Sequence, residues 1–192
     1  MNHYKKVIDE FRKSHDKSLL KEFKCESNEK TGCGNSFDTN YWNRKNLIFE
    51  LYNHYTIEDK TLIKWLLKEE GKGFELDIPV YTKDLCAYML YKHIELKDIY
   101  DLYNAKFGAG TDARFFIDIE LVFGIDKEQT KEFLSKQEKN KKLNNEILKT
   151  IRYYESNPNA RFRSREEYIH FFETKKIYQI KTELEDIEQE IR

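Results

Sequence analysis

Cysteine is scarce in this 192-residue sequence, and the three cysteines do not form a recognisable framework. Cys25 and Cys33 are separated by seven residues, which is wider than the usual zinc-knuckle spacing, and no close histidine pair accompanies them. Cys86 stands alone. We therefore expect three free thiols and no metal site. A chain of this length can bury enough surface to fold without a disulfide or a metal.

Long apolar runs are also missing, so no segment is long enough to span a membrane. The N-terminal residues include basic side chains but no apolar stretch behind them, so they do not match a signal peptide. We therefore expect a cytoplasmic protein that has no membrane partner. Charged residues make up 36% and aromatic residues 15% of the chain, which is typical of a water-exposed protein with an aromatic core.

The common catalytic motifs are absent as well. The sequence contains no HExxH pair, G-x-S-x-G elbow, P-loop or GxGxxG turn, and its five histidines are scattered. Gly108 and Gly110 precede an expected helix and could face an anion, but Asp112 follows them and would repel phosphate. The sequence therefore predicts no cofactor.

Glycine and proline are few, and they divide the chain into blocks with helical spacing of apolar residues. We predict one all-α domain over residues 1–192, built from stacked antiparallel helices. The stack could be solenoid-like. A long helix ends the chain. The expected helices cover about residues 4–23, 39–55, 56–71, 82–93, 95–107, 111–123, a short stretch from 127, 139–157 and 164–191.

Local signals mark several helix starts. Thr56 with Asp59, and Ser164 with Glu167, have the spacing of capping boxes, and Thr82 is the expected N-cap of its helix. Segments that begin at 57, 94 and 125 resemble one another, at offsets of 37 and 31 residues. This weak repeat favours stacked helix pairs over a compact bundle.

The C-terminal helix carries apolar residues at alternating steps of three and four: Ile177, Ile180, Leu184, Ile187 and Ile191. This is the seam of a coiled coil, but it covers only about two heptads. We expect it to pack against the body of the same chain. Homodimerisation through this helix is the alternative.

Residues 113–123 (ARFFIDIELVF) are ambiguous, because the apolar residues alternate from Ile117 onward as in a strand. We favour a helix, since no neighbouring strand is apparent to satisfy the backbone of a single strand. Asp118 and Glu120 could be metal ligands or an acid/base pair. We favour the other interpretation, in which Asp118 pairs with Arg114 or another base and Glu120 lies at a packing edge.

Arg165 and His170 provide the best enzymatic alternative, because they fit the R-x4-H pattern of a class of helical ribonucleases. Histidine can move protons near neutral pH, and Arg161 and Arg163 could hold RNA. The geometry argues against this alternative, since the two side chains would point about 140° apart on a helix. With Phe162, the same loop could bind nucleic acid, but the chain is not basic overall, so we expect no nucleic-acid partner.

Charge is distributed unevenly along the chain. Counting Lys and Arg against Asp and Glu gives −4 for residues 61–138, +6 for 139–181 and −4 for 182–192. Acidic residues around tyrosines suit a protein interface, because charges speed encounter and aromatic side chains anchor the partner. Solvated helix faces are the alternative. The candidate partner-binding residues are Glu95, Asp98, Asp101, Tyr103, Asp112, Asp118 and Glu120.

Three segments carry a resemblance to a known group: residues 103–107 (YNAKF), 116–124 (FIDIELVFG) and 130–134 (TKEFL). Together they resemble helical immunity proteins of bacterial polymorphic toxin systems. The resemblance implies a non-enzymatic inhibitor that neutralises one cognate toxin by direct binding. Acidic patches would suit a basic toxin, such as a nuclease domain. A helical ribonuclease and a non-catalytic interaction scaffold are the alternative functions.

Overall fold

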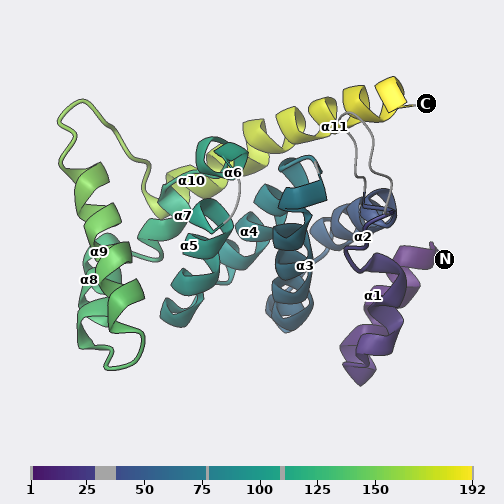
Figure 1. Ribbon diagram of the computed structural model, residues 1–192, viewed down its shortest axis with the longest axis horizontal. Coiled ribbons are helices and arrows are strands. Elements are labelled where there is room, and N and C mark those ends of the chain that lie inside the picture. Colours follow the sequence, from purple (N-terminus) through teal and green to yellow (C-terminus); the bar gives the residue numbers. More distant parts are fainter. Residues whose placement is uncertain (1, 29–37, 77, 109–110, 192) are drawn as a thin grey trace.

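The computed structural model describes residues 2–28, 38–76, 78–108 and 111–191 (Figure 1). Over these ranges the chain forms eleven α-helices and no strand, and an isolated antiparallel bridge joins Ser27 to Asp38. The all-α prediction is confirmed. None of the helices in the described ranges combines the length and the apolar character needed to cross a lipid bilayer.

The helices follow one another along the long axis of the molecule, from α1 at one end to the α8–α9 hairpin at the other (Figure 1). They are α1 (His3–Ser14), α2 (Tyr41–Tyr52), α3 (Lys60–Lys72), α4 (Tyr81–Lys92), α5 (Ile99–Phe107), α6 (Thr111–Phe116), α7 (Glu120–Phe123), α8 (Lys127–Lys136), α9 (Lys141–Glu155), α10 (Arg165–Phe171) and α11 (Ile177–Ile191). Four 3-10 helices connect them, namely η1 (Lys17–Phe23), η2 (Ile57–Asp59), η3 (Gly73–Leu76) and η4 (Leu96–Asp98).

The first helix is shorter than predicted. It ends at Ser14, because His15 adopts a left-handed conformation with φ of 51°, and the Asp16 side chain then caps η1 by accepting from the Ser18 amide. The predicted helical block over 4–23 is therefore divided into two helices. Short polar residues such as Asp16 favour caps and turns over helix interiors, which explains the break.

Helices α3 and α5 begin in the same way, at an offset close to that of the predicted repeat. Thr56 and Asp59 form the expected capping box before α3, and Glu95 and Asp98 form an equivalent one before α5. The equivalent residues are 39 positions apart, so the repeat is displaced by two residues from the sequence alignment. The predicted box of Ser164 with Glu167 is also confirmed.

Each of these buried capping carboxylates pairs with a base from the preceding layer. Asp59 accepts hydrogen bonds from Arg12 of α1 at 2.7 and 2.8 Å. Asp98 accepts from Lys60 and Lys64 of α3, both at 2.5 Å. These contacts hold α3 against α1 and α5 against α3, so the stacking is fixed by polar as well as apolar contacts.

The core surrounds α4, in which every residue from 82 to 91 is buried. Helices α2, α3, α5, α6, α7 and α11 all pack against it. Thr82 is therefore not the N-cap that the sequence predicts. The helix begins one residue earlier, and Thr82 Oγ1 donates to Glu70 Oε2 at 2.5 Å inside the core.

Residues 113–123 form neither a strand nor one continuous helix. Helix α6 ends at Phe116 and α7 begins at Glu120, so the predicted helix is interrupted over residues 117–119. The Lys106 ammonium donates to the carbonyl oxygens of Arg114 and Ile117, both at 2.5 Å. This lysine compensates for helical hydrogen bonds that the break removes.

The C-terminal helix is long, as predicted. Helix α10 continues through a π-helical turn, η5 (Phe172–Lys176), into α11, which crosses the stack above α4 and α3 (Figure 1). Ile177, Ile180 and Leu184 are buried. The expected packing of this seam against its own chain is confirmed for these three residues, whereas homodimerisation stays a prediction.

Candidate partner-binding groove

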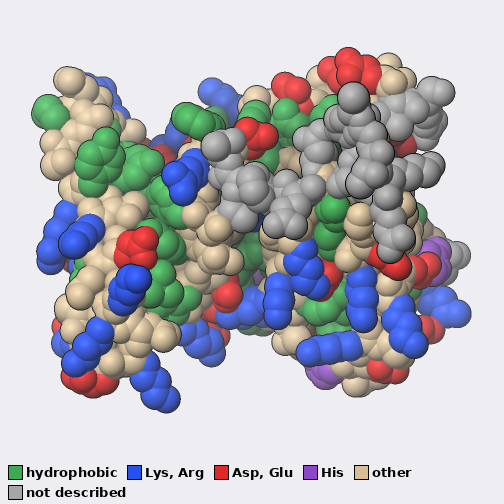
Figure 2. Space-filling view, in the orientation of Figure 1, with side chains coloured by type: hydrophobic (Ala, Val, Ile, Leu, Met, Phe, Trp, Pro, Cys, Tyr) green, Lys and Arg blue, Asp and Glu red, His purple; other side chains and the backbone are tan. Residues whose placement is uncertain are grey.

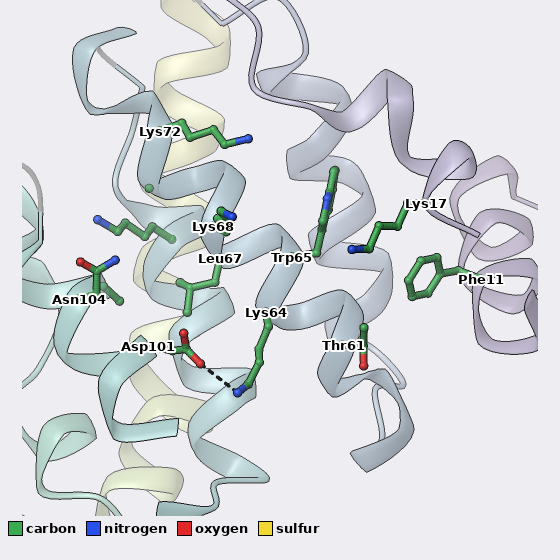
Figure 3. A pocket seen from close by; sticks show the side chains of 13 residues that line it. Phe11, Lys17, Thr61, Lys64, Trp65, Leu67, Lys68, Lys72, Asp101 and Asn104 are labelled. Atoms are coloured by element: carbon green, nitrogen blue, oxygen red, sulfur yellow. Dashed lines mark ion pairs between the residues drawn. The ribbon is translucent and has the colours of Figure 1, made fainter. Parts of the chain in front are cut away.

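A groove of about 580 Å³ lies along α3. Figure 3 shows Lys17 and Phe11 on one side of α3, Asp101 and Asn104 of α5 on the other, and Leu67 and Lys68 between them. Trp65 is half-buried in the groove. Its walls therefore combine long cationic side chains with aromatic and aliphatic surface.

Five lysines line this groove, against one carboxylate. Two of the five have partners: Lys64 pairs with Asp98 and Asp101, and Lys72 pairs with Glu69 at 2.5 Å. The side chains of the other three, Lys17, Lys68 and Lys83, make no hydrogen bond or ion pair within the described part of the chain. Figure 2 shows Lys and Arg side chains gathered over α3 and α1.

Lys83 is the unusual member of this set. It comes from the central helix α4, lines the groove, and is only 7% exposed. Burial lowers its pKa, and the charge of Glu70 opposes that shift only in part. Most of the Lys83 side chain is enclosed and its ammonium has no hydrogen-bonded partner in the described part of the chain, so an anion placed in the groove would offset part of the desolvation cost of this charge.

Glu95, Asp98 and Asp101, three of the candidate partner-binding residues, do not form an open acidic surface. Asp98 is fully buried between Lys60 and Lys64, and although burial raises its pKa, the hydrogen bonds from these lysines outweigh that effect and lower it. Glu95 pairs with Lys60 at 3.0 Å and with Lys97 at 2.7 Å. The prediction of Asp98 as a partner-binding residue is therefore wrong, because its side chain is not accessible.

Tyr103 and Asp112, two further candidate partner-binding residues, differ in exposure. Tyr103 is 9% exposed, its ring centroid is 4.9 Å from that of Phe107, and its hydroxyl is 3.4 Å from Thr150 Oγ1. Asp112 is exposed near the start of α6. Tyr103 thus contributes mainly to packing between α5 and α9, and Asp112 remains accessible to a partner.

Asp118 and Glu120 are both held by bases from the C-terminal part of the chain. Asp118 Oδ2 accepts from Lys176 at 2.5 Å and from the Tyr168 hydroxyl at 3.1 Å. Glu120 is buried and accepts from the Arg163 guanidinium at 3.1 Å. The predicted ion pair of Asp118 is confirmed, with Lys176 as the base in place of Arg114.

Lys176 also binds a second carboxylate, that of Asp84 in α4, at 2.7 Å. Asp84 is 1% exposed, and burial raises its pKa to about 6 despite the neighbouring ammonium. The triad of Asp84, Asp118 and Lys176 therefore joins η5 to α4 and to the break before α7. Among the described residues, no group of three or more His, Cys, Asp or Glu side chains is placed to hold a metal ion.

Arg165 and His170 are not brought together. The Arg165 guanidinium donates to the Lys92 carbonyl oxygen at 2.9 Å and lies 5.6 Å from the centre of the Tyr91 ring. His170 is exposed and lines a hollow that also includes Arg161 but not Arg165. The convergence on one phosphate that a ribonuclease requires is not present in this arrangement.

The two cysteines that the structure describes, Cys25 and Cys86, are free thiols, and Cys33 lies outside the described residues. Burial raises the pKa of Cys25 to about 12 and raises that of Cys86 as well. Neither thiol is therefore activated as a nucleophile, which requires a lowered pKa.

The sequence analysis did not predict the groove, although the spacing of lysines in the sequence indicates part of it. Lys64, Lys68 and Lys72 are spaced by four residues, which places them on one face of α3. The charge count over 61–138 obscured this stripe, because the acidic residues of the same segment are largely buried or paired. The contribution of Lys83 from another helix could not be read from spacing.

No family model, no curated protein and no solved structure matches this chain.

Proposed function

We propose that this protein acts by binding another macromolecule, and that its partner is a toxin protein which it neutralises by direct contact. The observation that carries the proposal is the groove along α3, where Lys17, Lys68 and Lys83 remain uncompensated. The resemblance of residues 103–134 to helical immunity proteins supports a toxin as the partner.

The other polar groups with chemical potential have structural roles. Asp84 and Asp118 share Lys176, which joins η5 of the long C-terminal helix to the body of the protein, and Glu120 binds Arg163 in the segment before α10. Groups that satisfy one another in this way stabilise a rigid scaffold. A rigid scaffold reduces the ordering cost that binding must overcome.

Exposed aromatic side chains supply further contact area. Phe115 of α6 is 83% exposed, Tyr153 of α9 is 74% exposed and Tyr178 of α11 is 64% exposed. Large aromatic side chains are enriched among the residues that dominate binding energy in protein interfaces. A specific complex typically buries about 1,600 Å² in total, so the partner would contact more than the groove alone.

The test is co-expression with a toxin encoded next to this gene. We expect growth to be restored, a complex to be recovered by affinity purification, and neutralisation to be complete at equimolar amounts. An enzyme that destroyed the toxin or its product would act at substoichiometric amounts. If the purified toxin neither forms a complex nor loses activity at equimolar protein, the proposal is refuted.

A further inference from the structure

The α3 groove has an internal organisation that points to the chemistry of its ligand. Lys83 lines it from α4 and is only 7% exposed, with no hydrogen-bonded partner in the described part of the chain, whereas Lys17 and Lys68 are exposed. Trp65 and Leu67 provide apolar surface beside these cations. A ligand that satisfied all of these groups would carry negative charge next to apolar side chains.

We propose that this groove binds a carboxylate-bearing segment of a protein partner, an inference that rests on the proposed function. One Asp or Glu side chain of the segment pairs with Lys83 of α4. Further carboxylates pair with Lys68 and Lys17, and an adjacent apolar side chain packs on Trp65. Charge-assisted hydrogen bonds in a partly dehydrated groove are stronger than surface ion pairs.

A protein segment fits the charges better than a nucleic acid does. The chain as a whole has a net charge of −1, whereas nucleic-acid-binding domains usually present an extended basic field. Lys64 and Lys72 in the groove are already matched by Asp101 and Glu69, so few cations remain for a row of phosphates. Three cations beside apolar walls suit spaced carboxylates instead.

The chain's own acidic C-terminal helix is not the favoured occupant. Within one molecule Glu188 pairs with Lys45 at 2.8 Å, and Glu183 accepts from the Tyr81 hydroxyl at 3.2 Å. Ile180 and Leu184 of the same helix are buried against the body. A second copy would have to break these contacts to insert this helix, which leaves a different protein as the occupant.

The experiment uses Trp65 as the reporter. The chain has only two tryptophans, so a Trp42→Phe background makes the fluorescence specific to the groove. The purified toxin is titrated against this protein and against versions that also carry Lys68→Glu, Lys83→Met or Lys142→Glu. Lys142 lies exposed on α9, away from the groove, and serves as the matched control.

We expect Lys68→Glu and Lys83→Met each to weaken binding by about tenfold or more, since each removes a charge-assisted contact. Lys142→Glu should leave the affinity unchanged. Circular dichroism should show that all versions are folded, because Lys83→Met replaces a lysine that has no ion-pair partner in the described part of the chain with an apolar side chain of similar length. If wild type binds the toxin and both groove variants bind it equally well, the groove is not the contact and the inference is overturned while the proposed function stands.

A synthetic peptide distinguishes failure of this inference from failure of the proposed function. If the toxin does not bind at all, the proposed function fails, and the groove is tested with an acidic peptide of alternating glutamate and leucine. We expect Trp65 fluorescence to respond to this peptide and not to its glutamine analogue. No response to the peptide, tighter binding of single-stranded DNA of equal length, or tighter binding of a peptide copying residues 177–191 would each overturn the inference.

Discussion

Lys176 is the residue whose removal should reveal most about how this fold is held together. Its ammonium lies 2.7 Å from Asp84 and 2.5 Å from Asp118, and it also donates to the Phe116 carbonyl oxygen at 2.6 Å. Lys176 is 8% exposed and Asp84 is 1% exposed. We predict that Lys176→Met, which keeps the apolar stem, strongly destabilises the protein.

The magnitude follows from the burial of the partner that is left behind. Removing one member of a buried ion pair typically costs about 3–5 kcal/mol, because the remaining charge is uncompensated. For a chain of this size each kcal/mol lowers the melting temperature by about 2–4 °C. We therefore expect a fall of about 6–20 °C for Lys176→Met, measured together with urea unfolding followed by circular dichroism.

The double variant Lys176→Met with Asp84→Asn is the matched control. It removes the more deeply buried of the two carboxylates that lose their ion pair, so it should recover part of the lost stability, which an effect of packing alone would not show. A loss below about 1 kcal/mol in the single variant, or no recovery in the double variant, would refute the argument that this ion pair joins η5 to α4.

The same site gives a pH dependence with a definite sign. Burial raises the pKa of Asp84 from 3.8 to about 6, so the folded state binds this proton more tightly than the unfolded state does. Stability contributed by this group is therefore highest below pH 4 and falls as the pH rises toward 6. The shift corresponds to about 3 kcal/mol. In Asp84→Asn that component should be absent, so the difference between the wild-type and variant stability profiles should change over this pH range; identical profiles for wild type and variant would contradict it.

Three further predictions follow from single contacts. Gly124→Ala should lower the free energy of unfolding by about 1–3 kcal/mol, because φ is +73° and the new Cβ would lie 2.6 Å from a neighbouring hydroxyl; urea unfolding indistinguishable from wild type would argue against this. Asp98→Lys should destabilise the protein by about 3–5 kcal/mol, whereas Asp101→Lys, on a half-exposed side chain, should leave its melting temperature nearly unchanged; equal losses would contradict the burial argument. Neither Arg165→Ala nor His170→Ala should change the cleavage of a labelled RNA, and a loss of cleavage specific to both would restore the ribonuclease alternative.

Local features of the fold were predictable from the sequence. The capping boxes at Thr56 and Ser164 depend only on residues three apart, and both are present. Apolar periodicity likewise identified the buried seam of α11 through Leu184. These signals are reliable because the interactions that create them span a single helical turn.

Features that depend on distant partners were not predictable. The break at residues 117–119 is supported by Lys106, and Asp118 pairs with Lys176, which is 58 residues away. No spacing rule connects such residues. The charge count over 61–138 also misled, since it treats a buried carboxylate such as Asp98 and an exposed lysine such as Lys68 as equal contributions to the surface.

Isothermal titration of the purified protein with the toxin encoded next to its gene is the most direct test of the central claim. We predict a one-to-one complex with an affinity typical of specific inhibitors, weakened by Lys83→Met. Titration that shows no heat of binding, together with undiminished toxin activity at equimolar protein, would contradict it.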